Sequence, residues 1–307
     1  MTSKPQSLRI ALVAVADILG YTEFVSRTST LEEGRRALEH FTVLMSKALS
    51  ALNAPRPETS GKRDNVRWRV RTYTDNYLLH TRLRKHGESD LGRAFEALGS
   101  FQCVLVRHHH LCRGGIAVGP AYIDDTIVFG RPVVEAHYLE QEIAKYPRIL
   151  LSNGIARIVA RNFAPYGGRP YTSTDYHILE DADGQWFVNY LAHGLTLNED
   201  EFGWMIDENL FSAHCALIAS GMRRYLTDDR VYTKYLWAAI YHNWFVRTHR
   251  LHEWHNDLLI DVPSAYDMKP PSPVSNERIA MLMDSYRRRL RGTDQDFDDV
   301  VRIAARL

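Results

Sequence analysis

The sequence predicts an α+β sandwich of the ferredoxin-like type with additions. Two observations support this prediction. Short apolar runs typical of strands are interleaved with longer segments whose apolar residues recur every three or four positions, as in helices. The elements follow the order strand, two helices, hairpin, helix, two strands, helix, strand, which suits a mixed sheet packed against helices.

The N-terminal elements are a strand and the helices that follow it. Residues 8–17 ("LRIALVAVAD") are dense in branched apolar side chains and too few to span a membrane, which predicts a buried strand. Residues 22–53 carry apolar side chains at steps of three, four or seven, which predicts helical structure. We expect Gly34 to divide this stretch into two helices.

The middle of the chain alternates between strands and helices. Two runs of alternating polarity, 66–72 and 76–83, surround the turn composition "YTDN" and predict a hairpin. The further predicted elements are a helix at 90–110, strands at 114–119 and 122–129, a helix at 131–146, a strand at 148–152 and a hairpin at 175–191.

The chain changes character after about residue 192. No strand pattern returns there, and aromatic-rich helical segments such as "KYLWAAIYHNWFV" dominate. We therefore predict two parts, a first domain at 1–194 and a helical C-terminal extension at 195–307.

Composition limits the classes of partner. The 307 residues carry a formal net charge of +1, so no strong electrostatic field favours nucleic acid or a membrane surface. The three cysteines show no C-x-x-C spacing and indicate reduced thiols, and the N-terminus lacks an apolar signal core. We expect a soluble cytoplasmic protein that binds neither nucleic acid nor membrane.

Two acidic residues follow apolar strands at comparable places. Asp17 closes the first predicted strand and Asp75 lies in the turn of the first predicted hairpin. If these strands are neighbours, the two carboxylates converge at one edge of the sheet and suit Mg²⁺ or Mn²⁺, which favour oxygen ligands and share substrate phosphates. Taken singly, each aspartate is also typical of a helix N-cap or a turn.

The stretch "ILGYT" directly follows Asp17. A glycine-containing turn that leads into a helix presents backbone N–H groups and the positive end of the helix dipole, which together bind phosphate. Most glycine turns bind no ligand, so this turn indicates phosphate binding only in combination with the two acidic residues.

Four stretches resemble the motifs of class III nucleotidyl cyclases. "VADILGYTEF" resembles the first motif, "RTYTDNYLL" the second, "CRGGIAVGP" the third, and "IVFGRPVVEAHYLE" the turn and dimer-interface helix of that family. The order and spacing match over roughly residues 8–192. The resemblance implies the ferredoxin-like class III nucleotidyl cyclase fold with a C-terminal helical extension.

The resemblance also implies an active site and an assembly. Asp17 and Asp75 would be the catalytic acids and would hold two divalent ions, Mg²⁺ or Mn²⁺, with the carbonyl of Ile18 as a further ligand. The protein would be a head-to-tail homodimer with active sites between the subunits, and the helix at 132–146 would form part of the interface. The amides proposed to bind the β- and γ-phosphates belong to Leu19, Gly20, Tyr21 and Thr22.

The chain departs from the family where the base is recognised. Arg71 stands where purine cyclases have a base-reading Lys or Glu, and Ile127 where they have a second base-reading acid. Val134 and Tyr138 replace the Asn and the transition-state Arg of the interface helix, so Arg131 and Arg113 become candidates for that cation.

These departures leave two functions open. Because the metal acids are retained, we favour an active cyclase over a degenerate cyclase-like binding module. Tyr73 and Phe129 beside Arg71 suggest a small pocket, similar to that of the bacterial antiphage pyrimidine cyclases of the Pycsar system. Arg71 only donates hydrogen bonds, and uracil has two carbonyls, so UTP is favoured over CTP or ATP. The resemblance implies that cyclic UMP activates a separate effector. Tyr73 is equally consistent with a core aromatic.

Overall fold

The computed structural model describes residues 7–26, 28–54, 67–73, 76–83, 87–124, 126–163, 177–198, 203–253 and 255–290. Its helices are α1 (Tyr21–Ser26), α2 (Leu31–Leu52), α3 (Gly87–Arg107), α4 (Arg131–Tyr138), α5 (Asn153–Phe163), α7 (Glu208–Arg224), α8 (Asp229–Thr248) and α9 (Asn276–Leu290). Its strands are β1 (Arg9–Leu19), β2 (Arg69–Tyr73), β3 (Asn76–Arg82), β4 (Leu111–Ile123), β5 (Val128–Gly130), β6 (Ile149–Leu151), β7 (Ile178–Glu180), β8 (Trp186–Val188), β9 (Leu195–Asn198), β10 (Gly203–Ile206) and β11 (Ser272–Pro273).

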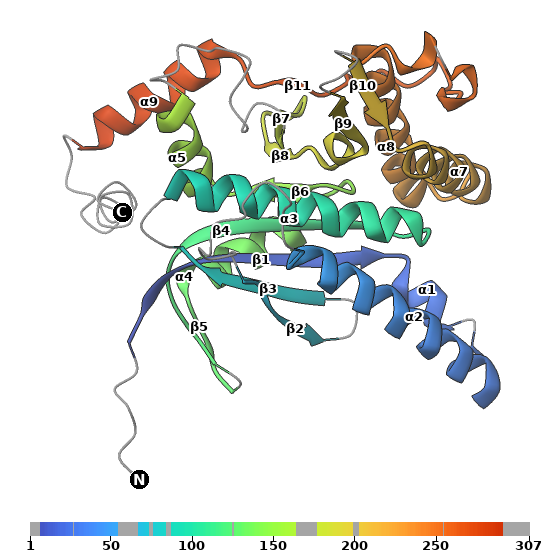
Figure 1. Cartoon of the computed structure of the whole chain (residues 1–307), viewed down its shortest axis with the longest axis horizontal. Helices are drawn as coiled ribbons and strands as arrows, with labels where there is room; N and C mark the ends of the chain where they lie inside the picture. Colours follow the sequence, from blue (N-terminus) through green and yellow to red (C-terminus); the bar gives the residue numbers. More distant parts are fainter. Residues whose placement is uncertain are drawn as a thin grey trace.

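The sheet confirms the predicted α+β class. Among the described residues its strand order is β11-β7-β8-β6-β4-β1-β3-β2, and β5 pairs with β4. Strands β4, β1, β3 and β2 are antiparallel neighbours, connected by α1–α2 and by α3, which is the ferredoxin-like βαββαβ arrangement. Strand β6 joins parallel to β4. Figure 1 shows α3 lying across the sheet, with α7 and α8 at one end.

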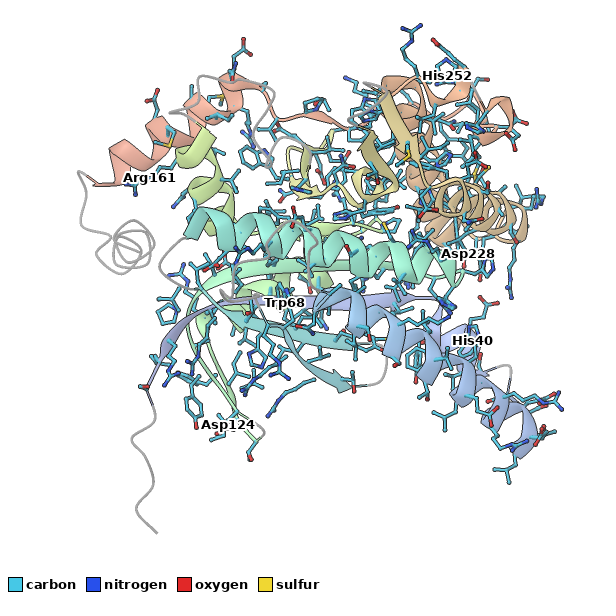
Figure 2. All side chains as sticks on the ribbon, viewed as in Figure 1. His40, Trp68, Asp124, Arg161, Asp228 and His252 are labelled. Atoms are coloured by element: carbon cyan, nitrogen blue, oxygen red, sulfur yellow. The ribbon has the colours of Figure 1, made fainter. Side chains whose placement is uncertain are left out.

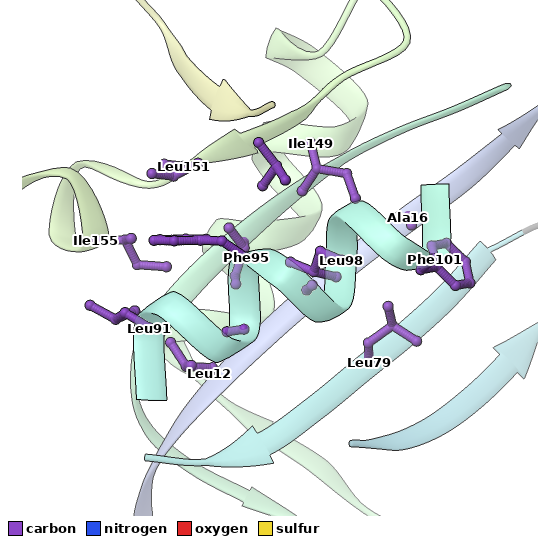
Figure 3. Close-up of a cluster of buried hydrophobic side chains, with 14 of the residues drawn as sticks. Leu12, Ala16, Leu79, Leu91, Phe95, Leu98, Phe101, Ile149, Leu151 and Ile155 are labelled. Carbon is purple, nitrogen blue, oxygen red and sulfur yellow. The ribbon is translucent and has the colours of Figure 1, made fainter. Parts of the chain in front are cut away.

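Alternation along β1 separates the two faces of this sheet. The side chains of Leu12, Ala14, Ala16 and Ile18 point to one face and join the largest hydrophobic cluster, which contains residues of α2, α3 and α5. Figure 3 shows α3 residues such as Phe95 packed on this face. We call it the covered face.

The opposite face, which we call the open face, has a small core. Ala11, Val13 and Val15 of β1 form a separate cluster there with a few alanines, and the helix that packs on them is α4. Small side chains bring α4 close to the sheet. A Cβ added to Gly115 of β4 would lie 2.4 Å from the Cβ of Leu139, so this close approach requires glycine.

Several predicted boundaries are wrong. The first helical stretch divides before Thr30 rather than at Gly34, because Thr30 and Glu33 form a reciprocal capping box that starts α2. The two strands predicted at 114–119 and 122–129 are largely one long strand, β4, with β5 after it. The predicted helix at 131–146 is α-helical to Tyr138 and π-helical from Leu139 to Ile143.

The segment after residue 192 contains strands that the sequence pattern did not predict. The short strands β9 and β10 pair with each other, and β11 pairs with β7 of the main sheet. Helices α7 and α8 share a hydrophobic cluster with residues of α3, β6 and β8. None of the described helices is long and apolar enough to cross a membrane.

A chain of hydrogen bonds is buried within this second cluster. The Nε2 atom of His242 lies 2.7 Å from the carbonyl of Leu258, so it donates, and Nδ1 of His242 accepts from Nδ1 of His214 at 2.9 Å. Nε2 of His214 then accepts from the Tyr190 hydroxyl at 2.9 Å. Both imidazoles are satisfied in their neutral form, and burial holds the pKa of His242 at about 4.

Candidate functional site

Asp17 lies on the open face, between two neighbouring strands. In the antiparallel register its partners are Asn76 on β3 and Arg113 on β4. The prediction that Asp17 closes the strand is wrong, because the residues up to Leu19 continue to pair with β4. Asp17 is therefore held on both sides by the sheet, which fixes the position of its carboxylate.

The Asp17 carboxylate belongs to a network of charged groups. Arg113 donates from Nε to Oδ2 of Asp17 at 2.9 Å, and its Nη2 lies 3.0 Å from Oε1 of Glu140. Nη1 of Arg113 donates to the carbonyl of Ala144. The side chains of Asp17 and Glu140 are 13% and 2% exposed, so solvent screens this network only weakly.

The π-helical turn explains how Glu140 reaches Arg113. The turn follows α4 directly, and α4 is held against β4 by the contact at Gly115. The other oxygen of Glu140 lies 3.6 Å from Nδ1 of His137. A buried carboxylate requires partners of this kind, because desolvation otherwise disfavours its charged form. The network therefore joins β1, β4 and the π turn into one polar unit.

The turn after β1 is open at Gly20, three residues after Asp17. Gly20 has φ +85°, a conformation that favours glycine, and a Cβ added there would meet no atom within 4 Å. The amide of Phe24 donates to the carbonyl of Gly20, which starts α1. Ile18 is buried on the covered face, and Tyr21 and Thr22 belong to the first turn of α1.

The predicted base-reading residues lie two strands away. Arg71 on β2 is in register with Leu78 of β3, which is in register with Val15 of β1. Strand spacing places the Cα atom of Arg71 about 12 Å from that of Asp17, on the same face. Nη2 of Arg71 is buried without a hydrogen-bond partner among the described residues. Tyr73 ends β2, but its side chain lies outside the described part, as do Thr74 and Asp75.

The charge of Arg71 acts on two neighbours. Burial, followed by the charges of Arg69 and Arg71, lowers the pKa of His80 to about 4. Hydrogen bonds from Tyr122 and from backbone amides, together with the Arg71 charge, hold the pKa of Asp124 at about 2. The charge of Arg71 therefore reaches the β4–β5 hairpin, which contains Asp124.

Phe129 lies on the β4–β5 hairpin. It is in register with Tyr122, nine residues along β4 from Arg113, the register partner of Asp17. Its side chain and that of Ile127 are exposed at the hairpin. On α4, Val134 is 70% exposed and Tyr138 is also exposed. We call these four exposed side chains, which come from the hairpin and from α4, two elements that follow one another directly in the chain, the β5–α4 patch.

The described residues supply only part of a metal site. Asp17 contributes a carboxylate, and Ile18 a backbone carbonyl, both of which are oxygen donors of the kind that Mg²⁺ and Mn²⁺ prefer. No group of three or more His, Cys, Asp or Glu side chains in the described part could hold a metal ion. Asp75, the second expected ligand, is the residue before Asn76, the register partner of Asp17.

Sequence reasoning missed one member of the charged network around Asp17. Glu140 was missed because a π turn has no periodic pattern in the sequence. Arg113 was named only as a candidate cation, and the adjacent glycines of "CRGGIAVGP" were the available signal for a close helix contact.

Comparison with known proteins found a weak structural likeness. No family model and no curated protein matches this chain. A solved structure to which it is similar is that of the guanylyl cyclase Cya2, with 14% identity over 60% of this chain and 94% of that chain, and a TM-score of 0.38. Identity and TM-score this low do not indicate a function.

Proposed function

We propose that this chain is a nucleotidyl cyclase that converts a nucleoside triphosphate, preferably UTP, into the 3′,5′-cyclic nucleotide and pyrophosphate. The observation that carries the proposal is the position of Asp17. Its carboxylate lies on the open face, beside the Gly20 turn and opposite Asn76, the residue after Asp75. A carboxylate next to an open glycine turn is suited to a triphosphate and its divalent ions.

Asp17, Asp75 and the carbonyl of Ile18 would hold two Mg²⁺ or Mn²⁺ ions. Such ions neutralise phosphate charge and lower the pKa of the attacking ribose 3′-hydroxyl. The chain itself would position the substrate. The backbone amides of residues 19–22 would donate to the β- and γ-phosphates, and the paired Arg113 would hold the Asp17 carboxylate in place.

Arg71 would recognise the base. Its Nη2 atom is a buried donor with no hydrogen-bond partner among the described residues, and an unmade hydrogen bond of this kind costs roughly 1–3 kcal/mol. A pyrimidine carbonyl would satisfy it. Uracil offers two carbonyls and cytosine one, which favours UTP. Arg71→Ala should therefore reduce turnover of UTP more than turnover of ATP.

Each active site would lie between two chains of a homodimer. The family resemblance implies a site shared between two chains, and Phe129 lies nine residues along β4 from the register partner of Asp17. The β5–α4 patch supports an interface there. On the helix expected at this interface, Val134 is exposed, but Leu139 is already buried within its own chain.

Mixing two inactive variants tests the shared site. Asp17→Asn homodimers should be inactive, and Arg71→Ala homodimers should turn over UTP only slowly. If Arg71 serves the site of the partner chain, a mixed dimer has one intact site and one doubly altered site. Random mixing should then restore about a quarter of the wild-type activity. A mixture that stays inactive would show that Asp17 and Arg71 act in the same chain.

The direct test of the function is turnover of the four nucleoside triphosphates with Mn²⁺, with detection of the cyclic product and pyrophosphate. We expect cyclic UMP to form fastest and Asp75→Ala to abolish its formation. Val134 and Tyr138 stand where the family has its transition-state side chains, so a degenerate module that only binds nucleotide is the second candidate. Binding without turnover of any triphosphate would favour it.

The resemblance to antiphage pyrimidine cyclases supports a biological role. The cyclic nucleotide would be a second messenger in the cytoplasm and would activate a separately encoded effector. Cyclic UMP that accumulates in cells during phage infection, and that is lost in the Asp75→Ala strain, would support this role. Protection from phage without any cyclic nucleotide would contradict it.

A further inference from the structure

Arg113 is shared between two carboxylates, one from β1 and one from the π turn. Its Nε atom donates to Oδ2 of Asp17 at 2.9 Å, and its Nη2 atom lies 3.0 Å from Oε1 of Glu140. These distances and the width of one guanidinium place the two carboxylate oxygens within about 8 Å of each other. Glu140 is therefore near enough to act electrostatically on an ion bound at Asp17.

Glu140 is held in this position by β4 and by the rest of the π turn. Leu139, the residue before it, lies against Gly115, which is two residues after Arg113 on β4. Nη1 of Arg113 donates to the carbonyl of Ala144, the residue that ends the turn. The strand and the turn therefore fix Glu140 and Arg113 relative to each other.

Glu140 changes the charge that these three side chains present to a divalent ion. Asp17 and Arg113 alone would form a neutral pair, whereas the two carboxylates and the guanidinium together carry a net charge of −1. Solvent screens this charge weakly, because the Asp17 and Glu140 side chains are 13% and 2% exposed. Asp124 does not supply this charge, since it lies at the tip of the β4–β5 hairpin, away from the end of β1 (Figure 2).

The hydrogen bond from Arg113 does not prevent Asp17 from ligating an ion, since an ionised carboxylate has about four lone-pair sites. The positive charge of Arg113 nevertheless repels a divalent cation at the same place. A second carboxylate on the other side of Arg113 offsets this repulsion without occupying the position of the ion.

We propose that Glu140 is a positioning residue that raises the affinity of the Asp17 site for Mg²⁺ or Mn²⁺ by balancing the charge of Arg113. This inference rests on the proposed function, because it names a residue that controls metal binding at the same site. It also gives the π turn a role, since this turn brings a buried carboxylate to Arg113.

Binding of Mn²⁺ alone, followed by the paramagnetic resonance signal of the free ion, tests the inference without turnover. Glu140→Gln should weaken binding by roughly tenfold, because a single charge at about 8 Å acts on a doubly charged ion through a partly buried medium. Asp17→Asn should abolish the binding and thereby locate the ion. The matched control is Glu142→Gln, which removes an exposed carboxylate from the same π turn and should change the affinity by less than about twofold.

A double variant separates the charge of Glu140 from its packing. Arg113→Met combined with Glu140→Gln removes the ion pair but leaves the net charge of −1. Replacing both members of a buried pair is often tolerated, and this variant should bind Mn²⁺ within about threefold of wild type. The charges of His137 and Lys234, which also act on this network, are the same in all variants.

Three results would overturn the inference: unchanged Mn²⁺ binding by Glu140→Gln, an equal loss in Glu142→Gln, or a double variant that binds as weakly as Glu140→Gln. Wild-type protein that binds no Mn²⁺, or Asp17→Asn that still binds it, would also overturn it. If Glu140→Gln does not fold, Arg113→Gln tests the same charge with the opposite sign. It should bind Mn²⁺ more tightly than wild type, and weaker binding would contradict the inference.

The proposed function fails separately. If Glu140 sets the Mn²⁺ affinity at Asp17 but wild-type protein forms no cyclic nucleotide, the cyclase proposal falls and the role of Glu140 stands. If cyclic nucleotide forms and Glu140→Gln binds Mn²⁺ like wild type, the role of Glu140 falls and the cyclase proposal stands.

Discussion

The two faces of the central sheet come from the same strands but differ in what they do. On β1, Leu12, Ala14 and Ala16 bury themselves in the large core beneath α2, α3 and α5. Ala11, Val13 and Val15 point to the open face and belong to a small core. Asp17, the next residue on that face, pairs with Arg113. The covered face supplies stability, and the open face holds the charged groups near the candidate substrate site. Substitutions on the two faces should therefore affect different measurements.

Phe95→Ala should have the largest effect on stability. Phe95 is fully buried on the covered face, and removing a ring from such a site costs about 3–5 kcal/mol of unfolding free energy. Chemical denaturation measures this loss, and turnover per folded molecule should change little. Val134→Ala, at an exposed position of α4, is the control and should fall within about 0.5 kcal/mol of wild type. Equal losses in the two variants would contradict the distinction between the faces.

Acid should affect the stability contributed by two histidines differently, one buried on α8 and one on the open face of the sheet. His242 has a pKa of about 4 in the folded chain and about 6.5 when unfolded, so the unfolded state binds more protons between these values. Stability should therefore fall as the pH drops through this window, by about 3 kcal/mol at pH 4 for this histidine. His80 on the open face is partly solvated, so screening should make its contribution smaller.

Denaturation curves between pH 7.5 and pH 4 in two variants separate these contributions. His242→Asn should show a shallower dependence on pH than wild type, and His80→Asn should stay close to wild type. The carboxylates titrate equally in both variants, so their contribution to the pH dependence cancels when the two curves are compared. If stability depended less on pH in His80→Asn than in His242→Asn, His80 rather than His242 would be the main source of the acid sensitivity.

Glu140→Gln tests the buried charged network on the open face. It keeps the shape of the side chain but removes a charge that pairs with Arg113, which should cost about 1–3 kcal/mol. Glu39→Gln, in an exposed pair with Arg35 on α2, is the control and should cost less than about 0.5 kcal/mol. If thermal melts showed the same loss of stability in both variants, the buried network would contribute no more to stability than an exposed ion pair.

Leu38→Gln should have the smallest effect on stability, within about 0.5 kcal/mol. Leu38 on α2 is 65% exposed, and Leu31 and Val43 on the same helix are exposed as well. If this helix contributes to the dimer interface together with the β5–α4 patch, the substitution should weaken association in sedimentation experiments. Unchanged association would remove α2 from the interface.

Apolar runs and element order made the α+β class and strand β1 predictable from sequence, although Asp17 was expected to close this strand and instead lies two residues before its end. The capping box at Thr30 and Glu33 was also readable, although Gly34 was chosen instead. Glu140 was not predictable, because its partner Arg113 is distant in sequence and a π turn has no periodic pattern. The ion pair of Glu140 with Arg113 depends on tertiary contacts.

The most direct test of the central claim compares stability and turnover in Asp17→Asn. This substitution keeps the shape of the side chain and leaves Arg113 paired with Glu140, so the unfolding free energy should change by no more than about 1 kcal/mol. Cyclisation of UTP should fall by at least about a thousandfold, because the charge that holds the metal ions is lost. Turnover close to wild type in the folded variant would contradict the assignment of the open face as the active site.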